Sequence, residues 1–135
     1  MFDNQAKLIE KRLGDNWLAT PIAWDGVEYI PSPGKPWIRI QVSWADSTLI
    51  SGTSDGGVYR ETGIITIGVF TANKTGTRSN QDFCSSIANI FRGWSEGSLF
   101  CQAPYVVRVG EENEWFYQNV IIPFFYDNCF VQEVV

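Results

Sequence analysis

The sequence predicts an α+β domain in which an antiparallel sheet of four to five strands carries two helices packed on one face. Two stretches, at 2–17 and 83–94, place apolar residues at helical spacing, and several others alternate apolar and polar residues as strands do. The length of 135 residues and the 44% hydrophobic content suit one domain, residues 1–135. A chain of this size can bury an ordinary core without metals or disulfides.

Each predicted helix has one apolar stripe and residues that suit its ends. Asp3 or Asn4 can cap the start of the first helix, and Gly14 can close it. Ser79 with Asp82 forms a variant of the capping box at the start of the second. The stripes consist of Phe2, Ala6, Ile9, Leu13 and Trp17 in the first helix, and of Phe83, Ile87, Ile90, Phe91 and Trp94 in the second.

The strands are predicted from alternation and from the turn residues between them. Residues 37–44 alternate strictly, which is typical of a half-buried strand. Residues 58–71 are apolar on both faces, which indicates a central strand. Residues 98–109 and 115–126 are two further extended runs, and residues 22–30 suggest a small hairpin or bent strand.

Between two of these strands, Asp46 to Gly57 is rich in Ser, Thr, Gly and Asp around an isolated Leu49-Ile50. This composition predicts a loop that is longer than a hairpin needs. Long loops in compact domains are often functional, so the segment is a candidate for contact with a partner.

The residue types exclude much of ordinary enzymology. The chain has no histidine, so it cannot supply a Ser-His-Asp triad or an HExxH zinc site. The three cysteines, at positions Cys84, Cys101 and Cys129, form no CxxC pair. Their odd number and wide spacing favour reduced, mostly buried thiols. We therefore expect no catalytic residue, no metal and no cofactor.

The charge argues against a nucleic-acid-binding surface. The formal net charge is −5, whereas phosphate-binding domains are usually basic. Residues 1–80 are neutral overall, so the whole excess lies in residues 81–135. The sequence contains no run of about 18 consecutive apolar residues, which is the length that a membrane span needs. The N-terminus lacks the basic and apolar segments of a secretory signal, so the chain is expected to begin in a cytoplasm.

The order of motifs along nearly the whole chain resembles the tail terminator, or tail completion, proteins of bacteriophages with long non-contractile tails. The leading helix and a loop of small residues contribute to this likeness. The other motifs are Thr20-Pro21-Ile22-Ala23-Trp24-Asp25-Gly26, Pro36-Trp37-Ile38-Arg39, Arg60-Glu61-Thr62-Gly63, Ile90-Phe91-Arg92-Gly93 and the final strand from Trp115 to Asp127.

The resemblance implies a structural virion protein at the head-proximal end of the tail. Such proteins assemble, typically as hexameric rings, on the last ring of the tail tube. There they end tube polymerisation and provide the surface to which the head docks. The implied partners are further copies of the chain, the major tail tube protein and a head completion or neck protein. DNA would pass through the lumen without specific binding.

A ring subunit needs two different contact surfaces. The sequence predicts one of them, at the polar loop and its flanking strands. The interface candidates there are Trp44, Asp46, Leu49, Asp55 and Arg60.

Three alternatives remain open from the sequence. The chain could be another head–tail connector or neck protein. It could be a small ligand-binding domain with Trp24, Trp37 and Trp115 as aromatic walls. It could also be a hydrolase with the carboxylates of Asp25 and Glu28 as acid and base.

Overall fold

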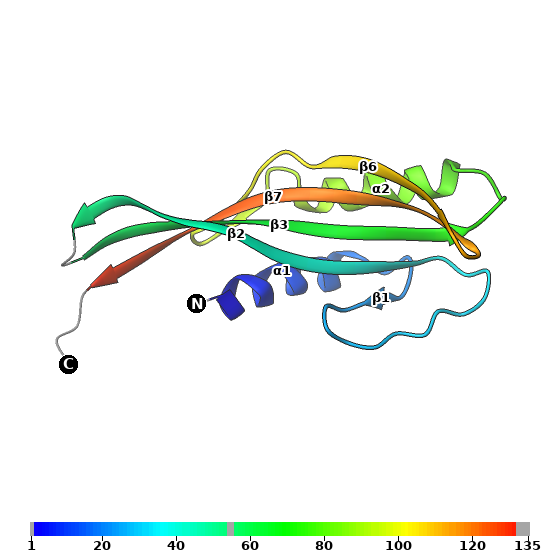
Figure 1. The fold of residues 1–135 in the computed structure, drawn as a ribbon, viewed down its shortest axis with the longest axis horizontal. Helices are drawn as coiled ribbons and strands as arrows, with labels where there is room; N and C mark the ends of the chain where they lie inside the picture. The colour runs from blue at the N-terminus through cyan, green and yellow to red at the C-terminus, as the bar shows by residue number, and fades with distance from the viewer. Residues whose placement is uncertain (1, 54–55, 132–135) are drawn as a thin grey trace.

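The computed structural model describes residues 2–53 and 56–131, and it is dominated by three long strands (Figure 1). The elements in chain order are α1 (Phe2–Asn16), β1 (Ile22–Ala23), β2 (Trp37–Thr53), β3 (Gly56–Ala72), α2 (Arg78–Phe91), β4 (Ser95–Glu96), β5 (Leu99–Cys101), β6 (Tyr105–Glu112) and β7 (Trp115–Val131).

One sheet contains all the strands of the described residues. Its order is β1-β2-β3-β7-β5-β4, and β6 pairs with β7 next to β5. β1 runs parallel to β2, and the other pairs are antiparallel. The three strands β2, β3 and β7 are each 17 residues long and pair along almost their whole length.

The predicted fold class is therefore wrong. The sheet has seven strands rather than four to five, strands make up about half of the chain, and the sheet curls into a half-barrel instead of forming a layer with two helices on one face. The short strands account for the difference in number. β1 lies within the predicted extended piece 22–30, and the single predicted run 98–109 is two strands, β5 and β6. β4 was missed, because its two residues are too few to show an alternation.

The main hydrophobic core lies between the sheet and the two helices. The predicted burial of Ile9, Leu13 and Trp17 in the stripe of the first helix is confirmed. The cluster consists of Ile9, Leu13, Trp17, Ile38, Ile40, Ile65, Ile67, Val69, Cys84, Ile87, Ala88, Phe91, Leu99, Val120, Ile122 and Phe124.

A smaller aromatic cluster lies on the other face of the sheet. Phe70 alternates with the core residue Val69, and its cross-strand partners are Trp37 and Tyr117. The Phe70 ring stacks on Trp37 at 4.1 Å and on Tyr117 at 4.6 Å between ring centroids. The guanidinium of Arg39 lies 5.1 Å from the centre of the Phe70 ring. This half of the sheet is thus packed on both faces.

The helix ends differ from the predicted ones. α1 continues past Gly14 to Asn16, and α2 begins at Arg78 after Thr77, which makes no capping hydrogen bond with its side chain. The inward face of α2 also includes a polar residue, Asn80, which is fully buried. Its side-chain amide donates to the carbonyl oxygen of Val69 at 2.8 Å and accepts from Gln118 at 3.1 Å. The spacing of apolar residues in a sequence does not indicate such a buried, hydrogen-bonded polar side chain.

The predicted loop from Asp46 to Gly57 is wrong as well. β2 continues through Thr53 and β3 starts at Gly56, so these residues form the far end of a long hairpin. The connecting residues 54–55 lie outside the described residues. Residues 27–30, predicted as a short extended piece, are not a strand either, and residues 24–36 form the connection from β1 to β2.

Candidate assembly surface

The far ends of β2, β3 and β7 extend beyond the N-terminal end of α1 (Figure 1). We call this region the arm and define it as residues 44–53 of β2, 56–62 of β3 and 125–131 of β7. The strands hold together by pairing, with Leu49 opposite Tyr59 and Arg60 opposite Asp127. Two register shifts, at Trp44/Asp46 and Leu49/Ser51, mark bulges or irregularities in the pairing of β2 with β3.

The predicted interface residues lie on or beside this arm, but on two different faces. Glu61 is buried and points to the core side. Trp44 and Leu49 share its alternation, because their cross-strand partners are Gly63 and Tyr59. Asp46 and Arg60 fall on the opposite face. Asp55 lies outside the described residues. The arrangement therefore separates the predicted set into an apolar pair and a charged pair.

The core-side face of the arm is only partly covered. Trp44 packs edge-to-face on the buried ring of Phe124, with 5.4 Å between the ring centroids. It is nevertheless 36% exposed, and Leu49 and Tyr59 further along are 43% and 38% exposed. Large apolar groups in a row on an exposed surface are typical of a protein-binding site.

The opposite face carries an ion pair set among aromatic rings. The guanidinium of Arg60 donates to both carboxylate oxygens of Asp127, at 2.8 and 3.0 Å, and lies 4.2 Å from the centre of the Phe125 ring. The hydrogen bond from Arg60 lowers the pKa of Asp127, and the same bond raises the pKa of Arg60. The charge of Arg60 is thus already paired with a carboxylate of its own chain. Phe100 of β5 stacks on Phe125 at 5.2 Å.

The structure reveals a second apolar surface that the sequence reasoning did not select. β6 has four large apolar side chains that are between 43% and 51% exposed, namely Tyr105, Val106, Val107 and Val109. Four such residues within five positions suggest a buried strand when read from the sequence. The signal that could have identified the surface is the preceding Pro104, which is typical of an edge strand.

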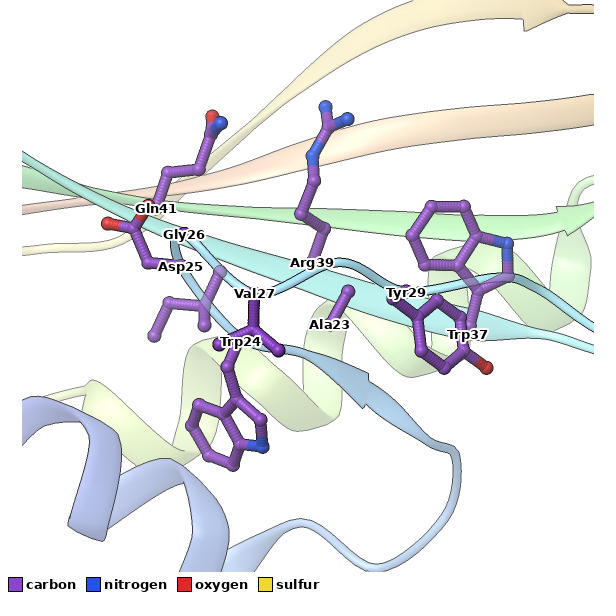
Figure 2. A pocket seen from close by; sticks show the side chains of 10 residues that line it. Ala23, Trp24, Asp25, Gly26, Val27, Tyr29, Trp37, Arg39 and Gln41 are labelled. Carbon is purple, nitrogen blue, oxygen red and sulfur yellow. The ribbon is translucent and has the colours of Figure 1, made fainter.

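A small cavity lies between the β1–β2 connection and β2. It has a volume of about 210 Å³ and its lining includes Trp24, Trp37, Asp25 and Arg39 (Figure 2). Two of the three predicted aromatic walls therefore line it, but the ring of Trp24 points toward α1 and away from Trp37 (Figure 2). The third, Trp115, instead packs against Trp37 edge-to-face at 6.0 Å. Ligand cavities usually measure about 300–1,000 Å³, so this one is small for a ligand site.

Asp25, one of the two carboxylates of the alternative hydrolase, has a structural role. A carboxylate oxygen of Asp25 accepts a hydrogen bond from the backbone N–H of Val42 at 3.2 Å. Asp25 thereby satisfies a donor at the edge of β2. Asp25 and Glu28 are both exposed to solvent.

Of the three thiols, Cys84 is buried and Cys101 is partly buried. Burial raises the pKa of Cys84 to about 12 and likewise that of Cys101 to about 12. Cys129 near the end of β7 is exposed. Among the residues that the structure describes, no group of three or more Cys, Asp or Glu side chains could hold a metal ion. No helix in the same residues is long and apolar enough to cross a membrane.

The arm and β6 define a class of protein, a β-rich domain with exposed large apolar side chains of the kind found where proteins bind each other. Comparison with known families is more specific. The family model of phage tail terminator proteins matches residues 6–114, so the chain belongs to the phage tail terminator family. Members of this family are structural proteins, and the chain is a component of the virion tail.

The structural comparison agrees at the level of fold. Nine chains of solved structures match, and one of them has a TM-score of 0.70 with 19% sequence identity, covering 100% of this chain and 98% of the other. This likeness concerns the fold alone. No curated protein matches the chain.

Proposed function

We propose that this chain closes the head-proximal end of the tail tube as a hexameric ring. In this role it ends tube polymerisation and provides the docking surface for the head. The proposal rests on one observation above all, the family match over residues 6–114. The partners in this proposal are further copies of the chain, the major tail tube protein and a head completion or neck protein. DNA passes through the lumen without specific binding.

The geometry supports such a role because a terminator must contact unlike partners. A ring subunit uses a heterologous interface to its neighbours and further surfaces toward the tube and the neck. The arm and β6 lie at different places on the sheet and both expose apolar side chains. One chain therefore carries more than one surface for protein contacts.

The test is the length of the tails. In a phage whose copy of this gene is deleted, we expect tubes of uncontrolled length and no joining of tails to heads, both visible by negative-stain electron microscopy. Tails of normal length that fail to join heads would instead indicate a connector or neck protein. Normal tails and normal virion yield would refute the proposal.

A substitution in the arm tests the predicted interface. Leu49→Lys should reduce the joining of tails to heads, because it places a charge on the apolar core-side face of the arm. Leu18→Lys is the matched control, since Leu18 is 90% exposed and lies outside the arm. Equal virion yield from the two variants would exclude the arm from assembly.

A further inference from the structure

We draw no further inference here: the strongest candidate, the exposed apolar edge strand β6, carries none because nothing in the described part of the structure shows what covers it.

Discussion

The side-chain amide of Gln5 donates a hydrogen bond of 2.9 Å to the carboxylate of Glu61, and both side chains are buried. This contact joins the first turns of α1 to the base of the arm. Buried polar groups are usually hydrogen-bonded, and this bond supplies a donor to Glu61, whereas the Oε1 atom of Gln5 has no partner in the described residues. The bond is one contact between α1 and the base of the arm, and it joins residues 56 positions apart.

Loss of this contact should destabilise the protein. Gln5→Ala leaves the buried Glu61 without that donor, which costs about 1–3 kcal/mol in the free energy of unfolding. The measurement is urea denaturation followed by tryptophan fluorescence. Gln81→Ala at an exposed position of α2 is the control and should change the free energy little. Equal values for the two variants would contradict the structural role of the pair.

Gly63 should tolerate no side chain. A Cβ atom there would lie 2.5 Å from the ring of Phe124 and 2.7 Å from the carbonyl oxygen of Ser43. We expect Gly63→Ala to lower the free energy of unfolding by about 1–3 kcal/mol through overpacking. Gly14→Ala in α1 is the matched comparison, because its Cβ would meet Trp24 at an ordinary 3.5 Å. That change should stabilise by about 0.5–1 kcal/mol. The same sign for both would refute this packing.

The stability contributed by Asp127 should depend on pH. Arg60 lowers the pKa of Asp127 through their hydrogen bond. The contribution is therefore present above the ordinary carboxyl pKa of about 3.9 and is lost as the pH falls through the lower value of the folded protein. Asp127→Asn should lower the denaturation midpoint at neutral pH and match the wild type at strongly acidic pH. Asp82→Asn, at an exposed site, should show no such convergence; a pH-independent effect of Asp127→Asn would contradict the prediction.

The thiols should differ sharply in reactivity. With the pKa of Cys84 and Cys101 raised to about 12, both stay protonated at pH 8, and Cys84 is also buried. An aromatic disulfide reagent should label the exposed Cys129 within minutes and the other two only after unfolding. Cys129→Ser should abolish the fast phase. Rapid labelling of two or three thiols in the native protein would show that the core around α2 opens.

The sequence predicted the elements that bury one face and missed those that do not. The stripe of Ile9, Leu13 and Trp17 could be identified because burial imposes a period on the sequence. Residues 46–53 show no such period, because the tip of the hairpin is exposed on both faces and is held mainly by backbone pairing. Ser, Thr and Gly are then sufficient for a strand, and they look like a loop.

The role of the predicted interface residues stays a prediction, and only their place in the fold can be compared with the structure. Four of the five predicted residues lie on or beside the arm, and the fifth, Asp55, is outside the described residues. Their division into two faces depends on the pairing of β2 with β3, which no local pattern specifies. The exposure of Val107 and its neighbours depends on what lies beyond β6 in the sheet. Only the complete topology gives that information.

The full-length pairing of β3 with β7 has a consequence for biosynthesis. Gly56 faces Val131 and Ala72 faces Trp115, so one whole side of β3 pairs with the last 17 residues of the described chain. Contacts between such distant segments slow folding. During translation, β2 and β3 can form a hairpin early, but the inner side of β3 stays open until β7 has left the ribosome. A nascent chain therefore becomes competent for ordered assembly only after β7 has been synthesised and has paired with β3.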